Sequence, residues 1–308
     1  MSHTKPEVSI SQVQRLLDNR FGQPIVNLSA AEVNGNFSSV FFFAHAGTEY
    51  VIRFGQDDAD YRKEQKIADM LATQGVPYPR ILAVGEEDRY LYAISERVQG
   101  DIVADLGPEQ KIAIMPDLIR SISHMNQIHL GKTTGYGWLT DDGNGTCETW
   151  SAAVEGMFAN RQPGSFWDDW MGLFETSCME REVFEELYPR LIAYSQYNAP
   201  HRHFVHNDCH QWNILSDGRR ITGIIDSNPL YGDFLIDIVT IEEAIPEQDV
   251  AEAFRRHYDA LGNPIEHFVE RLRGARYLKG IDCLRFYAKM GWDHAYVELR
   301  DQLLSLES

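Results

Sequence analysis

The sequence predicts an α+β fold in two lobes, with a five-stranded antiparallel sheet first and a mainly helical region after it. Short runs rich in Val, Ile, Phe and Tyr, separated by Gly, Asn and Ser, recur through the first third of the chain. After Gly100, apolar residues follow helical spacing instead. We therefore expect a nucleotide-binding first lobe at 1–95, a hinge at 96–100 and a helical second lobe at 101–308.

The first lobe is predicted to begin with a helix at 10–21, with Ser11 as a candidate cap. A second helix, at 61–71, is expected between the third and fourth strands, and Pro77 and Pro79 favour extended backbone directly after it. The five strands are expected at 25–28, 38–44, 50–54, 81–84 and 90–95.

The second lobe is predicted to be largely helical. Apolar periodicity covers 108–130, and because Pro116 lies inside this stretch, we expect a helix to start afresh there. Further helices are expected at 187–197, 234–244, 250–261, 265–287 and 294–304.

Composition is that of a soluble globular protein, with 44% hydrophobic and 24% charged residues in a chain of 308. The opening MSHTKPEVSI lacks an apolar signal region, and the densest apolar run, 40–44, is too short to span a bilayer. The four cysteines are widely spaced without C-x-x-C, which favours reduced thiols. We expect a cytoplasmic protein that does not associate with membranes, and a monomer.

The formal charge of −18 excludes a general nucleic-acid binder, which would be basic. An acidic field concentrates polycationic small molecules. Solubility alone is an equally good explanation for the charge.

The stretch 203–237 carries the chemistry. His206, Asp208 and Asn213 form the pattern H-x-D-x-x-x-x-N, and a second apolar run ends at Asp226. Phosphoryl transfer needs an acid to orient and accept the proton of the attacking hydroxyl, and oxygen ligands for magnesium. Asp208 suits the first role as the catalytic residue, and Asn213 with Asp226 suits the second. His206 is expected to brace the loop, and Asp233 to support it.

The same stretch permits a different reading as a metal centre. Alternation along one strand could place several ligands on one face, drawn from His201, His203, His206, Asp208 and His210. This reading leaves Asn213 and Asp226 unexplained, so we favour phosphoryl transfer.

The stretch resembles the catalytic and metal-binding segments of the aminoglycoside phosphotransferase family, which has a protein-kinase-like fold. Asn207 stands where protein kinases have the Arg of H-R-D, and Asp226-Ser227-Asn228 stands in place of D-F-G. The resemblance implies a bilobal small-molecule kinase that uses ATP or GTP with Mg²⁺ and accepts a small-molecule substrate, expected to be a cationic aminoglycoside.

The resemblance also implies a nucleotide site. Arg53 lies on the third strand, where kinase-like folds present a lysine to the phosphates, and Glu64 on the following helix is its expected ion-pair partner. The small-residue loop 29–39, including Ser38, would bring backbone N–H groups close to the phosphates. The hinge would contact adenine through the main chain of Ser95, Glu96, Arg97 and Val98.

An aromatic insertion between the helices resembles the hygromycin B phosphotransferase branch of the family. It begins GYGWL and continues through Thr149-Trp150 to the run Phe166-Trp167-Asp168-Asp169-Trp170. Trp150 and Trp170 are therefore candidate substrate contacts, although for each ring a role in the core is the better expectation.

Other positions depart from that branch. Asp237 replaces its Glu, while agreeing with the G-D-x-x-x-D ending of the wider family, and the segment 240–246 is short and acidic where the branch has a longer run containing tryptophan. Glu242 and Glu243 are candidates for contacts with substrate ammonium groups, or else part of a solvated helix face. The main alternative function is a metabolite kinase of the same fold, acting on choline, homoserine or a sugar. A catalytically silent nucleotide-binding protein would not need Asp208, Asn213 and Asp226 together.

Overall fold

The computed structural model describes residues 5–31, 38–56 and 61–306. The chain divides into two compact units. The first comprises Met1–Asp101 with Leu215–Asp217 and Ile221–Ile225, and the second comprises the rest. Two short pieces of the expected second lobe are thus grouped with the first unit.

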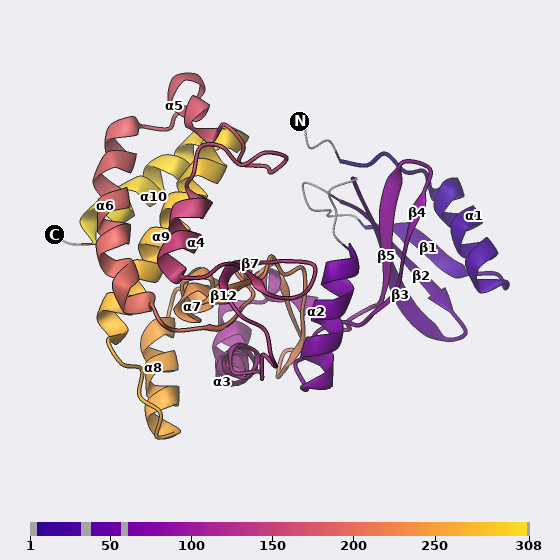
Figure 1. Ribbon diagram of the computed structural model, residues 1–308. Coiled ribbons are helices and arrows are strands. Elements are labelled where there is room, and N and C mark those ends of the chain that lie inside the picture. Colours follow the sequence, from indigo (N-terminus) through magenta and orange to yellow (C-terminus); the bar gives the residue numbers. More distant parts are fainter. Residues whose placement is uncertain (1–4, 32–37, 57–60, 307–308) are drawn as a thin grey trace. The chain divides into compact units, whose positions relative to one another are not determined.

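The first unit contains a five-stranded antiparallel sheet in the order β1-β2-β3-β5-β4 (Figure 1), which confirms the predicted sheet. It holds two helices, α1 (Ile10–Phe21) and α2 (Tyr61–Thr73), and its strands are β1 (Val26–Ala30), β2 (Ser39–His45), β3 (Thr48–Gly55), β4 (Ile81–Glu87) and β5 (Tyr90–Glu96). A smaller sheet has the order β11-β10-β6, formed by β6 (Asp101–Ile102), β10 (Ile214–Ser216) and β11 (Ile221–Ile224).

Alternating side chains explain why the five strands form one layer. Phe41 and Phe43 of β2 point to the same face as Ile52 and Phe54 of β3, because successive side chains of a strand face opposite ways. This buried face packs with the apolar side of α1 in one core cluster. The core fixes the register of β3, which carries Arg53.

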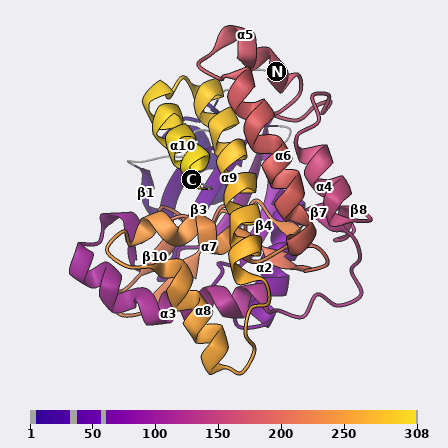
Figure 2. The same cartoon turned by 90° about the vertical axis from the view of Figure 1, so that its left-hand side faces the viewer.

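The second unit is mainly helical. Its long helices are α3 (Pro108–Asn126), α6 (Arg181–Asn198), α8 (Val250–Ala260), α9 (Phe268–Met290) and α10 (Asp293–Ser305), and its shorter helices are η1 (Val103–Asp105), α4 (Trp150–Met157), η2 (Trp170–Gly172), α5 (Leu173–Thr176), α7 (Leu235–Ile241) and η3 (Glu242–Ala244). Helix α9 packs against α6, α7 and α10, and Figure 2 shows it running between α6 and α10. Of the described helices, none has the length and apolar character needed to cross a membrane.

A four-stranded sheet, in the order β8-β7-β12-β9, lies within this helical unit. Its strands are β7 (Tyr136–Leu139), β8 (Gly145–Cys147), β9 (His203–Val205) and β12 (Leu230–Gly232). Strand β12 pairs with β9 and with β7, so the aromatic insertion is tied by backbone hydrogen bonds to the stretch that holds the candidate site.

Two expectations about the helices were wrong. Helix α3 runs without a break from Pro108 to Asn126, so no new helix starts at Pro116. A proline inside a helix removes one backbone hydrogen bond, and here burial of one side of α3, including Ile114, Leu118 and Ile122, outweighs that loss. Helix α6 similarly contains Pro189 and begins at Arg181, six residues before the predicted start.

A buried ion pair connects three parts of the second unit. Arg271 of α9 donates from Nε and Nη2 to the two oxygens of Asp233, each at 2.8 Å, and Asn198 of α6 donates to Asp233 Oδ2 at 2.8 Å. Asp233 is fully buried and Arg271 is 2% exposed. Asp233 follows β12 directly, so the pair fixes the end of that strand against α6 and α9.

We predict that Arg271→Met lowers the free energy of unfolding by about 3–5 kcal/mol, because Asp233 would stay buried without its cation. Urea denaturation measures the change. Arg255→Met, which breaks more exposed pairs on α8 with Glu252 and Asp259, is the control and should cost less than about 1 kcal/mol. Equal losses in the two variants would contradict the assignment. If the single variant does not fold, Arg271→Met combined with Asp233→Asn should restore folding.

Candidate active site

A buried carboxylate holds the loop that follows β9. Asp237 of α7 accepts the backbone N–H of His206 at 2.9 Å and of Asn207 at 2.7 Å, and the side-chain amide of Asn126 at 2.7 Å. Asp237 is fully buried. Burial raises its pKa to about 6, although the three hydrogen bonds oppose that change. The backbone at the start of the H-x-D-x-x-x-x-N pattern is therefore fixed from α7.

The same loop brings Asp208 and Asn213 together. Asn213 Nδ2 donates to the Asp208 carbonyl at 2.9 Å and to Asp208 Oδ2 at 3.2 Å. The Asp208 carboxylate is 44% exposed, and His210 Nε2 lies 3.6 Å from its Oδ1. Partial withdrawal from water raises the pKa of Asp208, while His210 and Lys279 lower it and Asp226 raises it.

The charge of Asp226 contributes to the raised pKa of Asp208. The Asn228 N–H, two residues later, donates to the His206 carbonyl at 3.1 Å, so the Asp226 segment is tied to the loop. Asp226 has a φ of 60° and Asn207 has a φ of 64°. Such left-handed backbone is uncommon outside glycine and clusters at functional sites.

The two residues expected to support the loop, His206 and Asp233, make different contacts. His206 is buried, and its Nδ1 accepts the Asp208 N–H at 3.3 Å, so it supports the peptide that leads into Asp208. Asp233 lies in the ion pair with Arg271 and also accepts hydrogen bonds from Asn198 and the Leu235 N–H. Its support acts through the end of β12.

Lys279 of α9 belongs to the site although the sequence did not indicate it. Its ammonium donates to the Asn207 carbonyl at 2.7 Å and to Asn207 Oδ1 at 3.2 Å. A lysine in a helix, 72 residues from its partner, carries no local pattern that distinguishes it from a solvated lysine.

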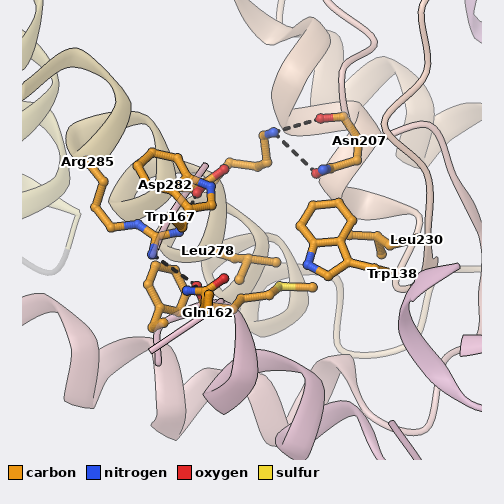
Figure 3. Close-up of a pocket in the computed structure, with 11 residues that line it drawn as sticks. Trp138, Gln162, Trp167, Asn207, Leu230, Leu278, Asp282 and Arg285 are labelled. Atoms are coloured by element: carbon orange, nitrogen blue, oxygen red, sulfur yellow. Dashed lines mark hydrogen bonds and ion pairs between the residues drawn. The ribbon is translucent and has the colours of Figure 1, made fainter. Parts of the chain in front are cut away.

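A pocket adjoins Asn207 (Figure 3). Tryptophan side chains and the hydrophilic side chains of α9 share its wall, and the lining residues are Trp138, Met157, Phe158, Gln162, Trp167, Asn207, Leu230, Leu278, Lys279, Asp282 and Arg285. Sequence reasoning quoted Trp138 and Trp167 within the insertion but did not single them out as pocket residues.

Arg285 of α9 packs against aromatic side chains of the insertion. Its guanidinium lies 4.4, 4.3 and 4.8 Å from the ring centres of Phe158, Trp167 and Trp170, and it donates to Asp282 Oδ1 at 2.6 Å. Cation–π contacts of this kind are strongest where water is excluded, and Arg285 is 1% exposed. Of this cluster, Phe158, Trp167, Asp282 and Arg285 line the pocket.

The candidate substrate tryptophans are buried. Trp170 is 1% exposed and its indole donates to the Ala159 carbonyl, and Trp150 is 3% exposed and packs on Gly232. A Cβ at Gly232 would lie 2.5 Å from Trp150 Cζ3, so glycine is required there. In this structure both rings pack in the core.

The two acidic residues that follow α7 differ in their contacts and exposure. Glu242 forms an ion pair with Arg276 of α9, whereas Glu243 is exposed. Glu242 is thus partly withdrawn from solvent by its ion pair, and Glu243 is the more exposed of the two.

The first unit carries the candidate nucleotide residues. Arg53 Nη2 donates to Glu64 Oε1, so the expected partner on α2 is the one observed. The guanidinium also lies 5.5 Å from the ring centre of Tyr61. Ser38 directly precedes β2, and residues 32–37 of the small-residue loop lie outside the described residues.

The expected hinge residues differ in how their backbone groups are hydrogen-bonded. Ser95 and Glu96 are the last residues of β5, and Ser95 is buried opposite Val51 of β3. The N–H of Glu96 donates to the Arg80 carbonyl and that of Arg97 to the Glu49 carbonyl. These two N–H groups are therefore engaged within the sheet.

The rival metal centre lacks a suitable geometry. Across residues 5–31, 38–56 and 61–306, no group of three or more His, Cys, Asp or Glu side chains is arranged to hold a metal ion. His203 instead packs its ring against Phe234, and burial lowers its pKa.

We predict a pH-dependent effect of Asp237→Asn. Because burial raises the pKa of Asp237 from 3.8 to about 6, the folded protein binds a proton that the unfolded chain does not between these values. Wild-type stability from this group is therefore present at low pH and is lost as pH rises through about 6. Relative to the variant, the wild type should gain about 1–1.5 kcal/mol between about pH 7.5 and about pH 5.

Chemical denaturation of the wild type and of Asp237→Asn at the two pH values measures this difference. The other titratable groups are the same in both proteins, so their contributions to stability cancel. A difference that does not change with pH, or that changes in the opposite direction, would show that the hydrogen bonds to Asp237 outweigh its burial.

Comparison with known proteins places the chain in a family. Residues 29–272 match the phosphotransferase enzyme family, APH. Hygromycin-B 4-O-kinase of Escherichia coli is 27% identical over 289 residues, covering 91% of this chain and 80% of that protein.

Solved structures show the same fold. The crystal structure of aminoglycoside phosphotransferase APH(4)-Ia matches with a TM-score of 0.80 at 23% identity, covering 97% of this chain and 98% of that one. A thermostable mutant of APH(4)-Ia in a ternary complex with AMP-PNP and hygromycin B matches with a TM-score of 0.80 at 23% identity, covering 96% and 97%. The chain therefore belongs to the phosphotransferase enzyme family and is a phosphotransferase.

Proposed function

We propose that the protein is a cytoplasmic kinase that transfers the γ-phosphate of ATP to a hydroxyl of an aminoglycoside-type antibiotic such as hygromycin B. The observation that carries this proposal is the loop in which Asn213 Nδ2 lies 3.2 Å from Asp208 Oδ2, with the backbone of the two residues before Asp208 held by Asp237. Similarity to hygromycin-B 4-O-kinase over 91% of the chain supports the acceptor class.

Asp208 acts as the catalytic base. Its carboxylate is partly exposed, so a substrate hydroxyl can reach it, and its raised pKa makes it a better proton acceptor than an ordinary aspartate. The acceptor hydroxyl donates to Asp208 and attacks the γ-phosphorus, and the bond to the bridging oxygen of ADP breaks. The proton of the hydroxyl passes to Asp208 as the phosphate ester forms.

Asn213 and Asp226 suit a magnesium ion. The Asn213 amide nitrogen is used on Asp208, which leaves the amide oxygen for a cation. Asp226 supplies a carboxylate close enough to affect Asp208, and a cation relieves the repulsion between the two acids. Magnesium takes such hard oxygen ligands together with nucleotide phosphates and supplies charge neutralisation at the transferred phosphoryl group.

The nucleotide is proposed to bind through the first unit. Arg53, oriented by Glu64, contacts the phosphates, and backbone near Ser38 adds N–H donors. The segment Ser95–Val98 contacts the base through main-chain groups, with the Glu96 carbonyl and the Val98 backbone as the available candidates because the N–H groups of Glu96 and Arg97 are engaged. GTP is the alternative donor.

The acceptor is proposed to bind in the pocket beside Asn207. Trp138 and Trp167 offer apolar surface for a sugar ring, and Asp282 offers a carboxylate for an ammonium or hydroxyl group. Glu243 adds exposed negative charge near α9, since it influences the raised pKa values of Cys283 and Tyr287.

A specific observation supports the second candidate, a metabolite kinase. Lys279 and Arg285 place two cations in the pocket wall against one carboxylate, Asp282. The pocket wall thus carries more positive than negative charge. It is therefore less suited to a polycationic acceptor than the net charge of −18 on the whole chain suggests. An acceptor with few ammonium groups, such as a sugar, fits it as well.

We predict that Asp208→Asn leaves nucleotide binding within about twofold of wild type and lowers turnover by at least about 100-fold, because only proton transfer and hydroxyl orientation are lost. Coupled ADP release measures turnover on a panel of hygromycin B, other aminoglycosides, choline, homoserine and sugars. Asp301→Asn, a change in an exposed residue of α10, is the control. Wild-type turnover by Asp208→Asn would contradict the assignment, and turnover of the wild type on a metabolite alone would select the second candidate.

Asp226→Ala should weaken magnesium-dependent binding of AMP-PNP by about tenfold or more, since a carboxylate ligand to the cation is removed. Calorimetric titration with and without Mg²⁺ separates this loss from nucleotide contacts that need no metal. Unchanged magnesium dependence would contradict the metal role of Asp226.

A further inference from the structure

One peptide group precedes the Asp208 side chain and is held at both ends. Its carbonyl, from Asn207, accepts a hydrogen bond from Lys279 Nζ at 2.7 Å, and its N–H, from Asp208, donates to His206 Nδ1 at 3.3 Å. Lys279 also reaches Asn207 Oδ1 at 3.2 Å, and Figure 3 shows both contacts to Asn207. The plane of this peptide sets the direction in which the Asp208 carboxylate leaves the backbone.

The backbone needs this restraint because Asn207 is left-handed, with a φ of 64°. Asparagine tolerates this conformation better than most residues, but it remains less favourable than ordinary helical or extended backbone. Asp237 holds the N–H of Asn207 at 2.7 Å, and Lys279 holds its carbonyl. Without Lys279, only one of these two backbone groups would be fixed.

The groups around Lys279 favour the protonated form of its amine. Burial lowers its pKa, but Cys283, Asp282, Asp208 and Asp237 raise it by more, so the net pKa is raised. The amine therefore stays charged, and a charged donor makes a stronger hydrogen bond to a carbonyl than a neutral one does.

We propose that Lys279 is a positioning residue for phosphoryl transfer, which fixes the Asn207–Asp208 peptide so that the Asp208 carboxylate faces the acceptor hydroxyl. This inference rests on the proposed function. Lys279 differs from Arg271, another cation of α9, because Arg271 pairs with a fully buried carboxylate, whereas Lys279 is partly exposed and lines the pocket beside the loop. A misplacement of a catalytic group by about 1 Å can cost about 100-fold in rate.

Lys279→Met and Lys279→Arg test the proposal in the full chain, with Lys289→Met as the control. Lys289 lies on the same helix, is exposed and contacts Phe166 rather than the loop. On the acceptor that the wild type uses, Lys279→Met should lower kcat by about 10- to 100-fold while KM for MgATP stays within about twofold. Lys279→Arg should recover much of the loss, because it keeps a charged donor. Wild-type kcat in Lys279→Met would overturn the proposal.

A second readout does not depend on turnover. Hydrogen exchange followed by mass spectrometry reports on a peptide covering 204–213, which contains the amide that Asp208 donates to His206. Lys279→Met should speed exchange in this segment by about tenfold, while exchange in the strands of the first unit and the urea midpoint stay unchanged. Lys289→Met should not alter the segment.

The two readouts separate the possible failures. If the wild type has no turnover on any member of the panel, the proposed function fails, and exchange alone then decides whether Lys279 holds the loop. If the wild type is active but Lys279→Met matches it in both kcat and exchange, only the role of Lys279 fails.

Discussion

The buried carboxylate of Asp237 is the constraint on which the candidate site depends. It is removed from water, and it is tolerated there because two backbone N–H groups and the Asn126 amide point at it. Those N–H groups belong to the residues directly before Asp208. The start of the loop is therefore held from α7 and α3, in addition to the hydrogen bonds within the loop itself.

Asp233 and Asp237 lie four residues apart in the chain and hold different parts of the second unit. Asp233 accepts hydrogen bonds from Arg271 and Asn198, and so fixes the end of β12 against α9 and α6. Asp237 instead accepts backbone hydrogen bonds from the loop that follows β9. Helix α9 then contributes a second contact, since Lys279 lies about two turns beyond Arg271 and reaches Asn207. One helix thus fixes both the end of β12 and the peptide that precedes Asp208, the proposed catalytic base.

Much of the fold could be predicted because its signals are local. Short runs rich in Val, Ile, Phe and Tyr predicted the five strands of the antiparallel sheet, and apolar spacing predicted α1 and the helices that follow Asp233. The Arg53–Glu64 pair was also expected, because the resemblance to kinase-like folds implies such a pair between this strand and the helix that follows it. The continuous helix through Pro116 was missed because burial of one face, which is a tertiary effect, outweighs the local cost of proline.

The site was only partly predictable for the same reason. Asp208, Asn213 and Asp226 are recognisable by spacing within one stretch, whereas Lys279 and the pocket depend on segments far apart in sequence. The burial of Trp150 and Trp170 likewise depends on packing that the local sequence does not specify. Their rings pack inward, and Arg285 joins Trp170 and its neighbours to α9. The insertion therefore shapes the pocket with its other tryptophans.

The central claim is that these residues move a phosphoryl group from ATP to a hydroxyl. The most direct measurement is phosphorus NMR of wild-type protein incubated with MgATP and hygromycin B, followed over time. The account predicts that the γ-phosphate signal falls as a phosphate monoester signal and ADP rise together. ATP that stays intact, or that yields only inorganic phosphate, would contradict phosphoryl transfer to this acceptor.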